Sequence, residues 1–367
     1  MRIMALVGTR PEAIKMAPVV DALRARDLAP TLIVTGQHPS LDLAAYGLDG
    51  LPSHHLGCAG MADPEAHAAV VAAEARPVQQ GCDLLLVHGD TSSALGGAIA
   101  GFQAGVPVGH VEAGLRSFDR LNPWPEEDNR VTIDEMATLL FAPTETSAAN
   151  LRAEGVGGEI HVTGNTAIDA LERLAGPLPQ WRVPDEGTPS LLVTCHRREN
   201  WGGNLRPVAM ALLEIARTRL ARIEVVLHPN PAMADAVRLL LGDEPGIRLL
   251  LPLTHPEMIS VMQRSTLILS DSGGVQEEAP ALGVPLLVLR ERTERPEGIA
   301  AGNMRLVGTS TAEIVQSVAR LLTDEAAYAA MARPALPYGD GRAGERIAAI
   351  VEEWLTRRLQ AEERLIA

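Results

Sequence analysis

The chain is poor in cysteine and in aromatic residues, and it has no long hydrophobic run. Its three cysteines are too few and too far apart for a disulfide framework or a zinc pattern, and they favour a reducing cytoplasm. Aromatic residues make up 3% of the chain, which leaves few platforms for stacking single-stranded nucleic acid. No apolar run approaches about 18 residues, and the N-terminal one is too short for a signal peptide, so neither a membrane-spanning helix nor a leader is expected.

Positive charge is also scarce and is unevenly divided between its two residue types. The chain carries 46 acidic residues against 32 basic ones, for a formal net charge of −14. This balance argues against a general nucleic-acid-binding protein, which would present a basic face. Of the basic residues, 31 are arginine and one, Lys15, is lysine. Lys15 is thus the one ammonium side chain in a sequence whose other basic side chains are guanidinium groups.

What the chain does contain is a regular alternation of short apolar runs and amphipathic stretches. Hydrophobic residues make up 46% of its 367 positions, and at roughly 100–200 residues per domain this length suggests two domains. The alternation predicts βαβ units, with parallel strands buried between helices on both faces. Strands are expected at 2–7, 31–34, 84–87, 106–111, 139–142 and 160–162, and helices at 11–26, 62–80, 91–104, 126–137 and 166–174.

A segment with four prolines and two glycines, 176–189, then predicts a linker before the alternation begins again. Strands are expected at 191–195, 223–227, 247–250, 267–270 and 285–289, and helices at 204–219, 255–264, 275–282, 310–322, 325–332 and 341–365. The predicted fold class is therefore α/β, with two Rossmann-like parallel-sheet domains facing a cleft. Ligands of such sheets bind beyond the carboxyl ends of the strands, so the residues after each strand are the candidates for a site.

The first strand is followed by a turn suited to an anion. Gly8 permits a tight turn, and Arg10 and Lys15 follow on or beside a helix N-terminus, where negative charge is favoured. An ordinary helix start with solvated charges would look the same. Neither the phosphate-loop pattern nor Gly-x-Gly-x-x-Gly occurs here, so a dinucleotide-binding fingerprint is excluded.

Acidic residues follow the next strands of the first half. Asp90 comes three residues after one of them and Glu112 directly after another, and Glu126 opens the next helix, four residues before Arg130. Individually, Asp90 could cap a helix, and Glu126 could simply pair with Arg130. Three carboxyl groups expected at one edge of a sheet, however, favour a catalytic cleft.

The second half supplies complementary groups. His196 and Arg197 follow its first strand and His228 follows its second, which favours anion binding. Ser272, Gly273 and Gly274 lead from a strand into a helix. A hydroxyl, open backbone N–H groups and a helix dipole together suit a diphosphate.

Two further residues of this half fit the same ligand. Glu278 follows the Ser-Gly-Gly about one turn into its helix, and Arg295 follows the next strand. The combination in a second α/β half is typical of a nucleotide-sugar diphosphate site.

Taken jointly, these motifs resemble those of the non-hydrolysing UDP-N-acetylglucosamine 2-epimerases over nearly the whole chain. The matching stretches begin at Gly8-Thr-Arg-Pro-Glu-Ala-Ile-Lys, His88-Gly-Asp-Thr, His110-Val-Glu-Ala-Gly-Leu-Arg, Pro123-Trp-Pro-Glu-Glu, Pro143-Thr-Glu-Thr-Ser, Thr163-Gly-Asn-Thr, His196-Arg-Arg-Glu, Asp271-Ser-Gly-Gly-Val-Gln-Glu-Glu, Thr293-Glu-Arg-Pro-Glu and Tyr338-Gly-Asp-Gly. The resemblance implies a glycosyltransferase-B fold whose last helix crosses back onto the first domain. The implied domains are 1–170 with 345–367, carrying the acid/base residues, and 171–344, binding UDP.

The resemblance also implies an activity and its site. The activity is reversible 2-epimerisation of UDP-N-acetylglucosamine to UDP-N-acetylmannosamine, for bacterial polysaccharide precursors, by elimination of UDP to 2-acetamidoglucal and its re-addition. The implied enzyme is a cytoplasmic homodimer that binds a UDP-sugar and UDP, needs no metal or nicotinamide cofactor, and has neither nucleic acid nor membrane as a partner. By matching position, the acid/base residues are Asp90, Glu112 and Glu126; the groups that stabilise departing diphosphate are Arg10, Lys15 and His196; the groups that hold UDP are Ser272, Gly273, Gly274 and Glu278, with Arg130, His228 and Arg295 as further contacts.

One region departs from the family pattern. Gln37 and Arg197 match a second substrate site through which many bacterial members are activated. Beside Gln37, this chain has Pro39-Ser40 where relatives usually have Arg and Gln or Glu, and Gly60-Met61 where they commonly have Gly-Gln. We therefore expect weak or absent activation by substrate, or a different substrate.

Other functions share some of these residues. An epimerase of UDP-linked diacetamido-uronic acids would have the same motifs, together with a basic group for the sugar carboxylate. A hydrolysing epimerase is disfavoured by the Thr9-Arg-Pro-Glu sequence. A glycosyltransferase of this fold would share the diphosphate cradle without the three acidic residues, whose presence also disfavours a non-catalytic sensor of nucleotide sugars.

Overall fold

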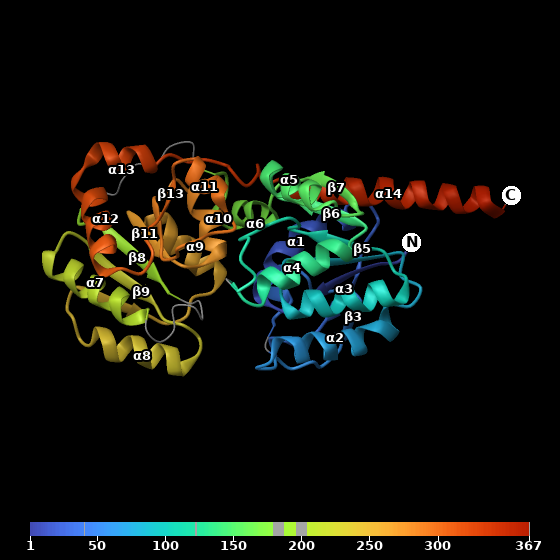
Figure 1. Ribbon diagram of the computed structural model, residues 1–367, viewed down its shortest axis with the longest axis horizontal. Helices are drawn as coiled ribbons and strands as arrows, with labels where there is room; N and C mark the ends of the chain where they lie inside the picture. Colours follow the sequence, from blue (N-terminus) through green and yellow to red (C-terminus); the bar gives the residue numbers. More distant parts are fainter. Residues whose placement is uncertain (40, 122, 179–186, 196–203, 367) are drawn as a thin grey trace. The chain divides into compact units, whose positions relative to one another are not determined.

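The computed structural model describes residues 1–39, 41–121, 123–178, 187–195 and 204–366 of the chain. By their internal contacts these residues form two compact units, Met1–Ala170 with Tyr338–Ala367, and Leu171–Pro337 (Figure 1). Each unit is built around its own parallel sheet, which confirms the predicted fold class. In the described part of the chain, no helix is both long and apolar enough to cross a membrane.

The first unit contains a seven-stranded sheet within the described ranges. In spatial order its strands are β3 (Ser53–His55), β2 (Thr31–Val34), β1 (Ile3–Val7), β4 (Leu84–His88), β5 (Val108–Val111), β6 (Leu139–Ala142) and β7 (Glu159–Val162), all parallel. From β1 the chain continues outward to β2 and β3, and it then returns to place β4 on the other side of β1. The turns after β1 and β4 therefore lie at the switch point of the sheet, where ligands of such folds bind.

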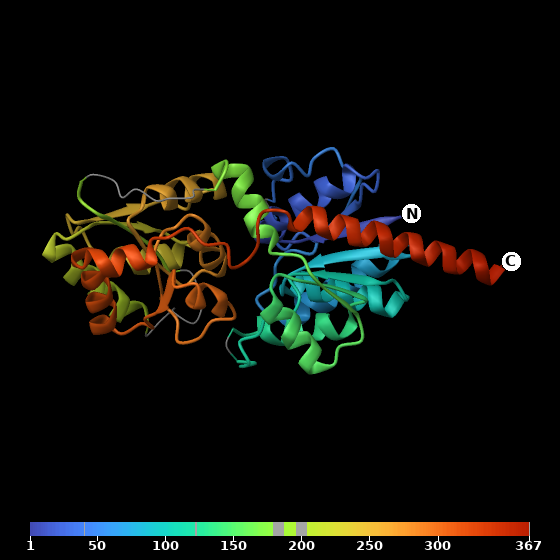
Figure 2. The same ribbon diagram turned by 90° about the horizontal axis from the view of Figure 1, so that it is seen from above.

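Helices cover both faces of this sheet. They are α1 (Arg10–Arg24), α2 (Pro64–Gln79), α3 (Ser92–Ala104), α4 (Glu126–Met136), α5 (Glu145–Glu154) and α14 (Ala343–Ile366), with a short 3₁₀ turn at Ala44–Tyr46. Helix α6 (Thr166–Ala175) begins in the first unit and ends in the second. Alternate residues of β1 point into the two layers: Ile3, Ala5 and Val7 pack with α1 and α14, whereas Met4 and Leu6 pack with α2 and α3. Figure 2 shows α14 lying across the first unit.

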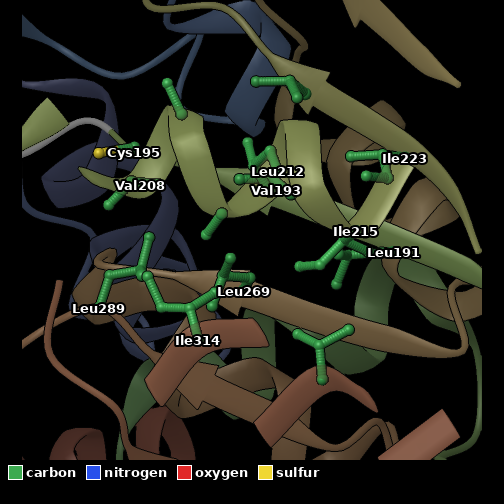
Figure 3. Close-up of a cluster of buried hydrophobic side chains, with 14 of the residues drawn as sticks. Leu191, Val193, Cys195, Val208, Leu212, Ile215, Ile223, Leu269, Leu289 and Ile314 are labelled. Atoms are coloured by element: carbon green, nitrogen blue, oxygen red, sulfur yellow. The ribbon is translucent and has the colours of Figure 1, made fainter. Parts of the chain in front are cut away.

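The second unit contains a six-stranded parallel sheet in its described residues. Its strands lie in the order β10 (Ile247–Leu250), β9 (Arg222–Val226), β8 (Ser190–Thr194), β11 (Leu267–Ser270), β12 (Leu286–Val288) and β13 (Met304–Leu306). Its helices are α7 (Leu205–Thr218), α8 (Pro231–Leu241), α9 (His255–Arg264), α10 (Gly273–Ala281), α11 (Pro296–Ala300), α12 (Thr311–Thr323) and α13 (Glu325–Met331). Figure 3 shows the core between sheet and helices, where Val193 and Leu269 meet Leu212 and Ile314. The switch point here lies between β8 and β11.

The sequence did not predict several short or atypical elements. The edge strand β3 has three exposed residues, and β13 also has only three residues. Neither is long or apolar enough for a strand pattern to be recognised in the sequence. Helices α5, α8 and α11 were also not predicted. The strand expected at 106–111 begins at Val108, because the N–H of Val106 still bonds to the Gly101 carbonyl at the end of α3.

The boundary between the units also differs from the prediction near the C-terminus. Residues 338–344 were assigned to the second domain, but they belong with the first unit. Tyr338 is buried, and its carbonyl accepts a hydrogen bond of 2.7 Å from the N–H of Asn165. The backbone N–H groups of Ala343 and Gly344 bond to Asp169, so the start of α14 is held to the start of α6.

Candidate active site

Glu12 ties together the two turns at the switch point of the first sheet. Its Oε2 accepts hydrogen bonds of 2.7 Å from the N–H groups of Gly8 and Thr9, and its Oε1 accepts one from the Thr91 hydroxyl after β4. Burial raises the pKa of Glu12, and the hydrogen bonds from Thr91 and Gly8 oppose that rise. From the sequence, Glu12 is recognisable only as the glutamate of a capping box with Thr9, which does not reveal its bond to Thr91.

Asp90 lies in the turn after β4 and is held by α4. The guanidinium of Arg130 bonds to Asp90 Oδ2 through Nε at 3.1 Å and through a second nitrogen, and the Asn129 amide donates to the Asp90 carbonyl at 2.8 Å. Arg130 is buried and also bonds to Glu127 at 2.7 Å. The Asp90 side chain remains 25% exposed, so its carboxyl group is both oriented and accessible.

Glu112 follows β5 and forms an ion pair with the lysine singled out by the composition. Lys15, one turn into α1, bonds to Glu112 Oε1, which also accepts from the Asn165 amide at 3.3 Å. Both charged side chains are 10% exposed or less. Glu112 has a left-handed backbone, with φ of 73°, which turns its side chain back at the end of the strand.

The Asp90 and Glu112 clusters lie side by side. A β-carbon built on Gly89, the residue before Asp90, would be 3.4 Å from Glu112 Oε2. The Gly89 carbonyl is bonded to His110 Nε2 at 2.9 Å, and His110 Nδ1 lies 2.6 Å from Asp134 on α4. His110 and Asp134 are fully buried. Helix α4 therefore holds the turn after β4 in two ways, through Asp134 and His110 to Gly89 and through Arg130 to Asp90.

The remaining candidates of the first unit lie near these clusters or along the same edge of the sheet. Glu126 is half-buried in the first turn of α4, and Arg10 is exposed at the start of α1. Burial and the positive charge of Arg10 lower the pKa of His38. The Gln37 amide oxygen accepts a bond of 2.6 Å from Ser93, the second residue of α3. The sequence left open a pair between Glu126 and Arg130; the structure pairs Arg130 with Asp90 and Glu127.

In the second unit, the turn after β11 opens α10. Ser272 is the N-cap residue of α10, and its N–H donates to the Ser270 hydroxyl at 3.0 Å. A β-carbon on Gly273 would lie 3.0 Å from an Arg295 nitrogen, so a larger residue here would push against this guanidinium. Gly273 and Gly274 begin the helix itself, with backbone N–H groups available to an anion.

Arg295 belongs to a buried cluster of charges. It bonds to Glu277 at 2.6 and 2.8 Å and to Glu294, which in turn bonds to Arg290 at 2.8 Å. Each of these two arginines is thus paired with a buried glutamate. A direct contact of Arg295 with a ligand stays a prediction.

Two candidate residues of the second unit have defined partners. Glu278 Oε1 lies 2.7 Å from Nε2 of His255, a residue for which the sequence predicted no role. His228 Nδ1 accepts from the N–H of Asn230, the N-cap residue of α8, at 2.9 Å. The predicted residues His196, Arg197 and Ser40 lie outside the described residues. Among the residues that are described, no group of three or more His, Cys, Asp or Glu side chains is arranged to hold a metal ion.

Comparison with known proteins connects this geometry to a family. The sequence model of the family described as UDP-N-acetylglucosamine 2-epimerase matches residues 21–352. The chain is 42% identical to the UDP-N-acetylglucosamine 2-epimerases of Yersinia pestis and of Escherichia coli K12, in each case over 95% of this chain and 97% of the relative. The chain belongs to the UDP-N-acetylglucosamine 2-epimerase family. It is therefore an enzyme of the isomerase class that works on nucleotide sugars, as the resemblance implied.

Solved structures agree with membership of the UDP-N-acetylglucosamine 2-epimerase family. The enzyme of Neisseria meningitidis bound to UDP-GlcNAc is 34% identical, with a TM-score of 0.85 over 97% of this chain and 100% of that one. The enzyme of Methanocaldococcus jannaschii in complex with UDP-GlcNAc and UDP is 31% identical, with a TM-score of 0.83 over 96% of this chain and 100% of that one. The two Rossmann-like units are thus of the glycosyltransferase-B type.

Proposed function

We propose that this enzyme interconverts UDP-N-acetylglucosamine and UDP-N-acetylmannosamine by eliminating UDP and adding it back. The observation that carries the proposal is the pair of oriented carboxyl groups, Asp90 and Glu112, on either side of Gly89 at the switch point. Relatives of the same family, at 31–34% identity, were solved with UDP-GlcNAc bound.

The chemistry explains why two carboxyl groups are needed. The C2 proton of the sugar is not α to a carbonyl, so its direct removal would give an unstabilised carbanion. Breaking the C1–O bond as a base takes the C2 proton instead gives 2-acetamidoglucal and UDP. UDP then bonds again to C1 while an acid returns a proton to the opposite face of C2. One acid/base group is required for each face.

The site residues divide between this proton transfer and the leaving group. Asp90 and Glu112 are the acid/base residues nearest C2, with Glu126 as the third member of the set. Arg130 and Lys15 keep the two carboxyl groups oriented by hydrogen bonds. Lys15, Arg10 and His196 stabilise the negative charge that develops on departing UDP.

The second unit binds the nucleotide. The N-terminus of α10, with Ser272 and Gly273, binds the diphosphate through its N–H groups and dipole. Glu278 accepts hydrogen bonds from the ribose hydroxyls, and His228 and Arg295 complete the contacts. We further propose that the enzyme acts as a homodimer in the cytoplasm and supplies a precursor for bacterial polysaccharides.

Incubation with UDP-N-acetylglucosamine in D2O tests the elimination route directly. Proton NMR is expected to show deuterium at C2 in both the gluco and the manno sugar, because the proton removed exchanges with solvent before re-addition. A manno product that keeps its C2 proton would contradict the route. Turnover of a UDP-diacetamido-uronic acid in place of UDP-N-acetylglucosamine would contradict the substrate assignment alone.

Initial rates test the departure near Gln37. We expect hyperbolic dependence of rate on UDP-N-acetylglucosamine concentration, because polar groups typical of the activating site are replaced by Pro39, Ser40 and Met61. The Gln37 amide oxygen is already engaged by Ser93. The reverse reaction is expected to start without added UDP-N-acetylglucosamine. Clearly sigmoidal rates, or a lag abolished by that sugar nucleotide, would contradict this prediction.

A further inference from the structure

Glu278 is held by a histidine from the neighbouring helix. Nε2 of His255, the first residue of α9, lies 2.7 Å from Glu278 Oε1 on α10. The side chains of His255 and Glu278 are 13% and 9% exposed, so water competes little for this contact. No described residue hydrogen-bonds Oε2 of Glu278, and this second oxygen is therefore open to a ligand.

The position of His255 is fixed by the start of its own helix. The preceding residue, Thr254, donates from its backbone N–H and its hydroxyl to Glu257, both at 2.7 Å. Further along α9, Ile259 and Met262 are buried. The imidazole is thus presented from a capped and packed helix rather than from a loop.

This hydrogen bond restricts the rotation of the Glu278 carboxylate. A glutamate side chain has three rotatable bonds, and a carboxylate free to turn loses entropy when it binds two groups at once. The two hydroxyls of a ribose are adjacent, and a carboxylate accepts from both when each oxygen faces one hydroxyl. Each carboxylate oxygen has two lone pairs, so Oε1 can accept from His255 and from a hydroxyl together.

We propose that His255 is a positioning residue for ribose recognition, and that it makes the site select ribonucleoside over 2′-deoxyribonucleoside diphosphates. The inference rests on the proposed contact of Glu278 with the ribose. It extends that proposal from binding of UDP to discrimination against deoxynucleotide sugars, through a residue with no part in the proton transfers at C2.

Calorimetric titration of the whole enzyme with UDP and with 2′-deoxyuridine diphosphate tests the inference. The unaltered enzyme is expected to bind UDP about thirtyfold more tightly, because the deoxy ligand leaves a buried acceptor without its donor. His255→Phe removes the N–H but keeps a flat ring, and it is expected to reduce this ratio to about threefold. Its affinity for the deoxy ligand should change less than about twofold. His255→Gln can still donate from a similar position and should restore most of the ratio.

Control measurements separate this role from a structural one. Ser260→Ala changes an exposed residue of α9, leaves the cap and His255 in place, and should leave the ratio unchanged. In His255→Phe, KM for UDP-N-acetylglucosamine should rise by about tenfold, and this rise should exceed any fall in kcat. An unchanged ratio in His255→Phe, or an equal loss of affinity for both ligands, would overturn the inference and leave the proposed function standing. Equal binding of the two ligands by the unaltered enzyme would remove the proposed Glu278 contact as well.

Discussion

Asp90→Asn is expected to lower the rate of epimerisation by about a thousandfold, which is the usual size of a lost general acid or base. The amide cannot take up or deliver the C2 proton. The asparagine keeps one side-chain oxygen that can accept a hydrogen bond from Arg130. The Asn129 amide bonds to the backbone carbonyl of residue 90, so the substitution leaves that bond in place. Affinity for UDP should stay within about twofold, because the nucleotide contacts are assigned to α10. Turnover by NMR and UDP titration measure the two quantities.

The matched control for this variant is Asp235→Asn. Asp235 is 72% exposed and pairs with Arg238 on the surface of α8, so neither activity nor affinity should change. Glu112→Gln should behave as Asp90→Asn does, since a second group must act on the other face of C2. If Asp90→Asn turned over substrate within about tenfold of the unaltered enzyme, Asp90 would have no role in the chemistry.

Lys15→Met is expected to reduce both activity and stability, because it leaves the Glu112 carboxylate buried without its counter-charge. Removing one partner of a buried ion pair costs about 3–5 kcal/mol. Loss of the ammonium should also lower kcat by about a hundredfold, the effect typical of a group that stabilises developing charge. Lys15→Arg should be nearly as inactive, since a planar guanidinium does not fit a place built for one compact donor.

A double-mutant cycle isolates the contribution of this pair. In Lys15→Met with Glu112→Gln, neither charge is left buried, so the loss in free energy of unfolding should be at least about 2 kcal/mol smaller than the two single losses added together. Urea unfolding measures all four proteins. Arg238→Met, which breaks an exposed pair, should cost less than about 0.5 kcal/mol. Strict additivity, or a normal kcat in Lys15→Arg, would show that the single lysine of this chain has no special role.

The order of the parallel sheets is what made the main site residues predictable. Strands that alternate with helices must end at one edge, so Asp90 and Glu112 could be placed together before any contact was known. The family resemblance then assigned roles that spacing alone left open. Side-chain partners could not be predicted from spacing alone. Arg130 has Glu127 within reach along its own helix, but its partner Asp90 follows a different strand.

Residues whose role depends on a side chain from another element could not be recognised from the sequence. Glu12 looks like an ordinary capping glutamate until the Thr91 hydroxyl is brought to it by another strand. His255 resembles any residue in the first turn of a helix, and its importance depends on α9 lying next to α10. Such contacts join positions 20 to 80 residues apart through packing, which no local pattern encodes.

The two ends of the chain share one hydrophobic core, and this has a consequence for biosynthesis. Ile347, Val351 and Leu355 of α14 are buried with Met16 and Val20 of α1. A ribosome making roughly 5–20 residues per second takes about 8–33 seconds to complete the second unit, 171–337, which lies between the two segments of the first unit. The first unit, which holds the acid/base residues, is therefore the last to finish folding. Until α14 emerges, the nascent chain exposes an apolar face of α1 that a chaperone could bind.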